Sequence, residues 1–145
     1  MIQLLFQNPV LFVLIFVSLI ISISIHEFSH AFMANYLGDN TAKSMGRMTI
    51  NPKAHLDPMG TFFLLFIGFG WGKPVIFNPL NLKNPKRDAA LISLAGPMSN
   101  LVLAVILSLV SRLFIAGGML WLFLYFLVLY NLMLGFFNLI PLGPL

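Results

Sequence analysis

The residues with the clearest chemical potential form the motif HEFSH, residues 26–30, at the end of a long apolar run. Residues i and i+4 of a helix share a face, so His26 and His30 can present two imidazole nitrogens to one ion. Neutral imidazoles suit zinc, and zinc lowers the pKa of a bound water to about 7. Glu27 can take the proton of that water and deliver it to a leaving amine. The spacing therefore predicts a zinc site that hydrolyses an amide.

The surroundings of this motif strengthen the prediction. No Lys, Arg, Asp or Glu occurs between Met1 and Ile25. Ionisable side chains inside an apolar span cost several kcal/mol unless they are paired or bound to a metal, roughly 3 kcal/mol each on insertion scales. This cost weighs against a simple pair of core histidines. Ser18 and Ser22 continue the polar row at four-residue spacing, although a membrane serine often bonds only to its own backbone.

Composition indicates a membrane protein. The 145 residues are 59% hydrophobic and 8% charged, with a mean hydropathy of +0.96, so lipid must be the solvent for most of the chain. The net charge of +4 is spread over the chain and does not indicate nucleic-acid binding. The absence of Cys excludes disulfides and thiolate metal sites. We expect a single domain over residues 1–145.

Three segments are long enough to cross a bilayer core of about 30 Å: residues 9–37, 85–114 and 118–137. Asn8 can cap the first of them, and the next residue, a proline, suits a first helical turn. We expect an all-α membrane protein in which three transmembrane helices form a catalytic core.

The region 38–84, between the first two spans, is rich in Gly, Pro and Asn. Its alternating pieces at 43–50 and 73–77 predict strands of a short membrane-associated β-sheet. The apolar piece at 60–70 is too short to span, which predicts a re-entrant or interfacial segment.

Charge placement predicts the orientation. Seven of the eight basic residues lie in or beside the region 38–84, and only Arg112 lies between the second and third spans. The positive-inside rule then puts this region in the cytoplasm and the N-terminus outside, in a multi-pass protein of the cell membrane (inner or plasma membrane). With that topology HEFSH, residues 95–100 and residues 138–145 converge at one depth on the cytoplasmic side. A lipid-facing bundle gathers polar groups at one depth where a function needs them.

Other polar residues have two interpretations each. Asn100, in AGPMSN, can orient a substrate carbonyl or an oxyanion, or it can pack helices. The same alternatives hold for Asn131, Asn138 and Pro141.

His55 and Asp57 lie in NPKAHLDPMG, where they can be ligands or substrate contacts. The crowding of Asn-Pro, Asp-Pro and Gly favours a turn for Asp57. The role of His55 stays open between the edge of a site and structure.

Five pieces together resemble the site-2 protease family of intramembrane zinc metalloproteases, in a compact form without PDZ or CBS modules. They are HEFSH at 26–30, NPKAHLDPMG at 51–60, GWGKPV at 70–75, AGPMSN at 95–100 and NLIPLGPL at 138–145.

The resemblance implies a three-helix core with Zn²⁺ held by His26 and His30 and with Glu27 as the base. It implies that Asn100 positions substrate, and Asn138 and His55 are further candidates for this role. It also implies a transmembrane protein substrate within the lipid bilayer, paired by strand addition to the connecting sheet.

The sequence departs from the family pattern at one point. The family continues NLIPLGPL with Asp-Gly, and that Asp is the third zinc ligand, whereas the sequence given ends at Leu145. We expect the ligand to follow Leu145, and a chain without it to be inactive. Two alternatives remain: a non-catalytic relative that binds transmembrane helices through an incomplete metal site, and a metal transporter. The gathering of polar groups at one depth weighs against the transporter.

Overall fold

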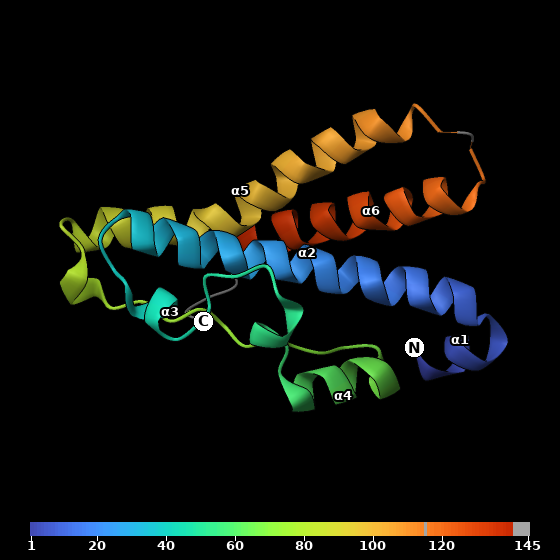
Figure 1. The fold of residues 1–145 in the computed structure, drawn as a ribbon, viewed down its shortest axis with the longest axis horizontal. Helices are drawn as coiled ribbons and strands as arrows, with labels where there is room; N and C mark the ends of the chain where they lie inside the picture. Colours follow the sequence, from blue (N-terminus) through green and yellow to red (C-terminus); the bar gives the residue numbers. More distant parts are fainter. Residues whose placement is uncertain (115, 141–145) are drawn as a thin grey trace.

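The computed structural model describes residues 1–114 and 116–140, and it is almost entirely helical (Figure 1). In chain order its helices are α1 (Ile2–Gln7), α2 (Pro9–Tyr36), α3 (Thr41–Ser44), the 3-10 turn η1 (Pro52–Ala54), α4 (Pro58–Ile67), the 3-10 turn η2 (Pro79–Asn81), α5 (Pro85–Ser111) and α6 (Met119–Leu139).

Helices α2, α5 and α6 are each long and apolar enough to cross a membrane, which confirms the expected three long apolar helices. Each of the three contacts the other two. The buried side of α2 carries small and polar residues, among them Ser18, Ser22 and Ala34, whereas large apolar side chains such as Val13 and Val17 are exposed. This inverted distribution suits a lipid solvent, in which small residues let helices approach closely.

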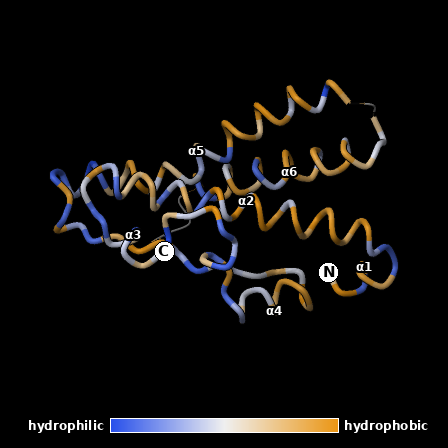
Figure 2. Tube along the Cα trace, in the orientation of Figure 1, coloured by the Kyte–Doolittle hydropathy of each residue, from blue (hydrophilic) through white to orange (hydrophobic). Residues whose placement is uncertain are grey.

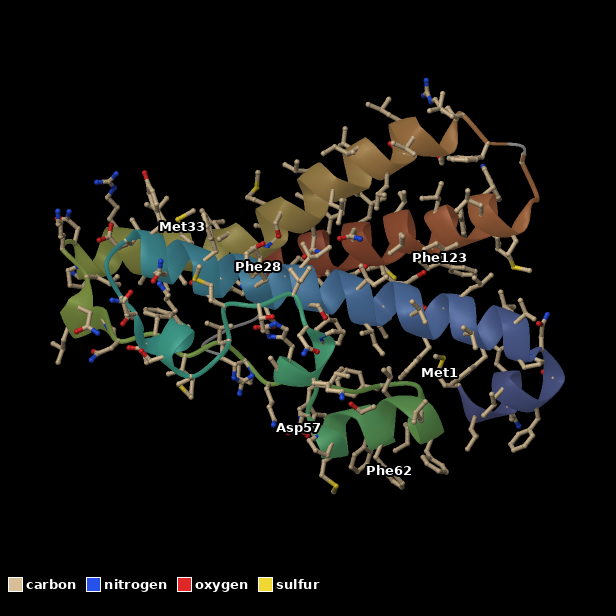
Figure 3. All side chains as sticks on the ribbon, in the orientation of Figure 1. Met1, Phe28, Met33, Asp57, Phe62 and Phe123 are labelled. Atoms are coloured by element: carbon tan, nitrogen blue, oxygen red, sulfur yellow. The ribbon has the colours of Figure 1, made fainter. Side chains whose placement is uncertain are left out.

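A shared local signal starts five of the helices. Each begins at a proline in its first turn, preceded by Asn or Asp as the N-cap, and these caps are Asn8, Asn51, Asp57, Asn78 and Asn84. Proline costs nothing at the first helical position because its missing N–H would have no helical partner. The side chain of Asp57 accepts the N–H of Gly60 at 2.8 Å, so this residue begins α4 rather than a turn between strands (Figure 3).

The predicted β-sheet is wrong for the part of the chain that the structure describes, which contains no strand. Residues 43–50 begin in α3, and Gly46 (φ 71°) then turns the chain. Residues 73–77 are not assigned to any helix or strand, and Pro74 has no N–H to offer a neighbouring strand. Pairing is limited to an isolated antiparallel bridge between Leu56 and Gly72.

The short apolar piece is the ten-residue helix α4, too short to span. In Figure 1 it lies apart from α2, outside the bundle of long helices.

A proline shapes α5. Pro97 lies inside this helix, where it removes one backbone hydrogen bond. Figure 1 shows the second half of α5 turning away from α2, as expected for a proline bend. Gly135 of α6 lies against α5 here, because a Cβ built on it would be 2.6 Å from Leu101 Cδ2.

One buried carboxylate fastens the connecting region to the end of α2. Asp39 is fully buried, and its two oxygens accept four hydrogen bonds at 2.6–3.1 Å: two from Thr41, one from the backbone N–H of Asn78 and one from the side chain of Asn81. Burial alone raises the pKa of this carboxyl, but the hydrogen bonds outweigh it and hold the pKa below its usual value. We call these four residues the Asp39 cluster.

Hydropathy is divided along the bundle. Figure 2 shows hydrophilic residues gathered around α3 and the start of α5, whereas the other ends of the three long helices are mostly hydrophobic. The Asp39 cluster therefore lies at the polar end of the molecule, beyond the last residue of α2.

Candidate metal centre

The two histidines of HEFSH face each other on α2. Their Nε2 atoms are 3.1 Å apart, and their rings meet edge to face at 82°. His30 Nδ1 lies 2.6 Å from the backbone carbonyl of Ile92 on α5. A carbonyl only accepts, so His30 Nδ1 must carry the hydrogen and its Nε2 must present a lone pair.

The second imidazole is held in the same way. His26 Nδ1 lies 2.5 Å from Oδ1 of Asn100, also on α5. With Nδ1 donating, His26 Nε2 presents a second lone pair to the first. Two nitrogen lone pairs 3.1 Å apart repel one another unless a cation lies between or beside them. Histidines that bind zinc usually do so through one ring nitrogen while the N–H of the other donates a hydrogen bond to an oxygen, and both histidines have this arrangement here. The donor set fits a zinc ion.

Space for these rings depends on one glycine. A Cβ built on Gly96 of α5 would lie 2.4 Å from His30 Nε2 and 2.7 Å from His26 Nε2. Real Cβ atoms essentially never approach so closely, so only glycine allows α5 to cover the two imidazoles at this distance.

Glu27 lies beside this pair at a cavity of about 200 Å³. The cavity is lined by both Glu27 and His26, by residues 70–72, and by Leu134 and Asn138 of α6. Glu27 Oε2 accepts the backbone N–H of Val75 at 3.2 Å, so the connecting region lies directly over this carboxylate. The Glu27 carboxylate and the His26 imidazole therefore line one cavity, which is large enough for several water molecules.

A second, larger cavity of about 330 Å³ adjoins the first and is apolar. The two share the walls formed by Ile23, residues 70–72 and Leu134, and the larger one extends between α4 and α6 to Leu64 and Phe137. The catalytic candidates therefore have an apolar space next to them.

The other predicted residues fall in three places. Asn138 lines the smaller cavity. Asn100 is fully buried, and both of its amide N–H groups are directed at protein oxygens rather than at the cavity. His55 is fully buried away from the cavity, where its Nε2 lies 2.7 Å from the carbonyl of Thr49.

No third His, Cys, Asp or Glu joins the histidines within residues 1–114 and 116–140. Pro141 and the rest of NLIPLGPL after residue 140 lie outside the described residues.

Sequence reasoning missed two parts of the site. One is the backbone of Val75, for which the GWGKPV motif is the nearest signal. The other is the link from Asn100 to Asn131 and Ser22. Each of these polar residues was recognisable in its own apolar segment, but the sequence does not show that they meet.

Comparison with known proteins gives the family. The sequence profile described as "Peptidase family M50" matches residues 14–120. The chain is 44% identical over 138 residues to "Putative zinc metalloprotease YwhC" of Bacillus subtilis, covering 89% of this chain and 63% of YwhC. It is 33% identical over 142 residues to "Putative zinc metalloprotease Rip2" of Mycobacterium tuberculosis, covering 92% of this chain and 54% of Rip2.

A third relative is "Zinc metalloprotease MJ0392" of Methanocaldococcus jannaschii, 28% identical over 139 residues, with 96% of this chain and 33% of that protein covered. The chain thus spans less than two thirds of the length of these curated relatives. No solved structure gives a significant match. The profile covers most of the chain and agrees with the family that the five motifs indicated: the chain is a membrane protein that belongs to peptidase family M50, the site-2 proteases.

Proposed function

We propose that this protein is an intramembrane zinc metalloendopeptidase that cuts transmembrane protein substrates. The observation that supports the proposal best is the pair of Nε2 lone pairs of His26 and His30, beside Glu27, on a helix long enough to span a membrane.

Each side chain has a distinct role in this mechanism. His26 and His30 would hold the zinc through Nε2. Zinc, when bound, supplies Lewis acidity that polarises a peptide carbonyl and acidifies water. Glu27 accepts the proton of the attacking water and passes it to the nitrogen of the leaving amine, so the peptide C–N bond breaks as a C–O bond forms. The N–H of Val75 keeps the Glu27 carboxylate turned towards the cavity.

The apolar cavity favours a substrate segment from the membrane. A soluble peptide would bring polar groups that this apolar space does not satisfy, whereas the apolar side chains of a membrane segment can enter it without leaving a polar group unpaired. The segment must unwind locally, because a helix shields its own peptide bonds, and unwound backbone at membrane depth is tolerated only when protein or a polar cavity surrounds it.

The orientation follows from charge. Seven of eight basic residues lie in or beside the connection between α2 and α5, which we assign to the cytoplasmic side of the cell membrane. The Asp39 cluster and the polar end of the bundle then face the cytoplasm, and water reaches Glu27 from that side.

The test is cleavage of a membrane-inserted substrate by the full-length protein in liposomes. Glu27→Gln keeps the shape and removes the base, so we expect cleavage to fall by about 10²-fold or more. A zinc chelator should stop cleavage by the parent, and added zinc should restore it.

Ser24→Ala is the matched control, because Ser24 lies on the same helix and bonds only to the carbonyl of Ile20. It should cut at the parental rate. Parental cleavage by Glu27→Gln would refute the mechanism. A protein that binds zinc and substrate without cutting would instead be a non-catalytic relative.

A further inference from the structure

A chain of hydrogen bonds inside the bundle leads away from the candidate metal centre. It joins His26 and Ser22 of α2, Asn100 of α5 and Asn131 of α6. Asn100, Asn131 and Ser22 are fully buried, and His26 is 6% exposed. The mechanism above assigns no role to Asn131 or Ser22, although neutral amides buried among apolar helices need a reason.

The donor and acceptor of each hydrogen bond in this series follow from its last member, Asn131. Asn131 lies 2.8 Å from the backbone carbonyl of Leu127, which can only accept. The amide nitrogen of Asn131 must therefore face Leu127, and the same nitrogen donates to Ser22 Oγ at 2.9 Å. Asn131 is left with Oδ1 facing Asn100 at 2.6 Å.

That oxygen fixes the next amide. Asn100 must donate through Nδ2 to Asn131 Oδ1, and the same Nδ2 donates to the carbonyl of Ser22 at 3.2 Å. Two acceptors thus hold the nitrogen of Asn100 on one side, which turns its Oδ1 towards His26 Nδ1. A flipped amide would set oxygen against oxygen twice.

The last bond sets the tautomer. With Oδ1 facing it, His26 can satisfy the contact only with a hydrogen on Nδ1, which leaves Nε2 bare. The carbonyl of Leu127 on α6 therefore determines which nitrogen of His26 is free, through two amides on two helices.

We propose that Asn131 is a positioning residue of the metal centre, which holds His26 in the Nδ1–H tautomer through Asn100. Ser22 supports it from both sides, with its carbonyl on Asn100 and its hydroxyl on Asn131. The proposal rests on the proposed zinc site for its second readout below, whereas the first readout needs neither metal nor cleavage.

The first readout is the tautomer itself, by ¹⁵N NMR of the full-length protein with labelled histidine, in detergent at about pH 8.5, where a histidine of ordinary pKa is neutral. The parent should show His26 protonated on Nδ1 alone. Asn131→Leu has a similar size and no polar atoms, so Asn100 loses one of its two orienting acceptors. The His26 signals should then show a mixture of tautomers.

The second readout is zinc affinity, measured with Zn²⁺ against a competing chelator. Groups that orient metal ligands are worth about 10- to 100-fold in affinity, and we expect a loss of roughly tenfold in Asn131→Leu. Ser22→Ala removes only the hydroxyl and should lose less. Ser24→Ala is its matched control, because both serines are buried on α2 and bond to a carbonyl four residues back, but Ser24 has no bond to Asn131.

Asn131→Asp separates positioning from packing. A buried Asp becomes protonated, and the neutral acid offers a carbonyl to Asn100 and a hydroxyl to Leu127. Positioning predicts that Asp restores most of the zinc affinity and the single tautomer that Leu loses. A purely structural role predicts the opposite order, because an acid costs more than Leu among apolar helices.

The proposal is overturned if Asn131→Leu folds and keeps one Nδ1–H tautomer with parental zinc affinity, or if Asn131→Asp loses more affinity than Asn131→Leu. Should Asn131→Leu fail to fold, the comparison of Ser22→Ala with Ser24→Ala decides: equal affinities would overturn it. The proposed peptidase mechanism fails by a different result, which is parental cleavage by Glu27→Gln, and that result would leave the tautomer and zinc-affinity comparisons for Asn131 unaffected.

Discussion

Two clusters of buried polar residues find their hydrogen-bond partners in different ways. The inner cluster (Ser22, His26, Asn100, Asn131) lies within the bundle and has no formal charge when His26 is neutral. The Asp39 cluster lies just beyond the end of α2 and is built around a carboxylate.

The difference follows from the solvent around each cluster. Inside a membrane a charge is costly, so the inner cluster uses amides and takes its direction from backbone carbonyls, which can only accept. Near the polar end a charge costs less, and one carboxylate can gather donors from distant segments, as Asp39 does with Thr41, Asn78 and Asn81. The neutral amides of the inner cluster orient His26, whereas the Asp39 carboxylate attaches the connecting region to the end of α2.

The largest expected effect is at the glycine that covers the inner cluster. Gly96→Ala would put a Cβ 2.4 Å from His30 Nε2 and 2.7 Å from His26 Nε2, the two nitrogens that we propose as zinc ligands. Either an imidazole or α5 must move, so we expect zinc affinity to fall by about 100-fold or more. Chelator competition with Zn²⁺ measures the loss.

Gly135→Ala is the matched control for this change. Its Cβ would meet the side chain of Leu101 at 2.6 Å, which is an equally close contact but lies between α6 and α5 rather than between α5 and the histidines of α2. It should lower stability more than zinc affinity. Equal affinity losses in the two variants would mean that close helix packing, and not space for the imidazoles, is what matters at Gly96.

The Asp39 cluster should respond in stability rather than in zinc affinity. Asp39→Ala leaves four hydrogen-bond donors without their carboxylate acceptor. Each hydrogen bond to a charged group contributes about 1.5–3 kcal/mol to the unfolding free energy. Water can replace some of them at this end, so we expect a loss of about 3 kcal/mol in unfolding free energy, measured in mixed detergent micelles.

Asp57→Ala is a useful comparison because Asp57 also accepts backbone N–H, but only that of Gly60 as the cap of α4. A lost cap costs about 1 kcal/mol. If Asp39→Ala costs no more than Asp57→Ala, the extra donors on Asp39 contribute nothing and the contrast between the clusters fails.

Acid should weaken the Asp39 cluster selectively. Its hydrogen bonds hold the pKa of Asp39 below the unfolded value of about 3.9. A lowered pKa adds stability that is fully present above the unfolded pKa and is lost as pH falls from about 4 towards the folded pKa. Unfolding free energy of the parent should therefore drop over this window by more than that of Asp39→Asn, and parallel curves would contradict the assignment.

The sequence predicted the parts of the molecule that depend on local pattern. HEFSH needs only helical spacing to bring His26 and His30 together, and long apolar runs are enough for α2, α5 and α6. The β-sheet was wrong because the alternation at 43–50 and 73–77 is too short to decide between a strand and other structure: residues 43–50 begin in α3, and Pro74 has no N–H to offer a neighbouring strand.

What the sequence could not predict depends on rotation and distance. Asn100 was recognised as a buried amide, but whether it meets substrate or His26 depends on how α5 is turned after the bend at Pro97. The donors of Asp39 come from positions 2, 39 and 42 residues away, a separation that no local pattern reveals.

The smallest expected effect is the coupling between the two amides of the inner cluster. A double-mutant cycle of Asn100→Leu and Asn131→Leu isolates their 2.6 Å bond. Hydrogen bonds between membrane helices average about 0.6 kcal/mol, with a maximum near 1.7, because the separated helices find other partners. We therefore expect a coupling of about 0.6 kcal/mol in unfolding free energy, well below the effect of Asp39→Ala, alongside a tenfold change in zinc affinity from Asn131 alone. A coupling as large as the Asp39 effect would mean that the inner cluster stabilises the helix bundle. Its amides would then serve stability, as the Asp39 carboxylate does, rather than the orientation of His26.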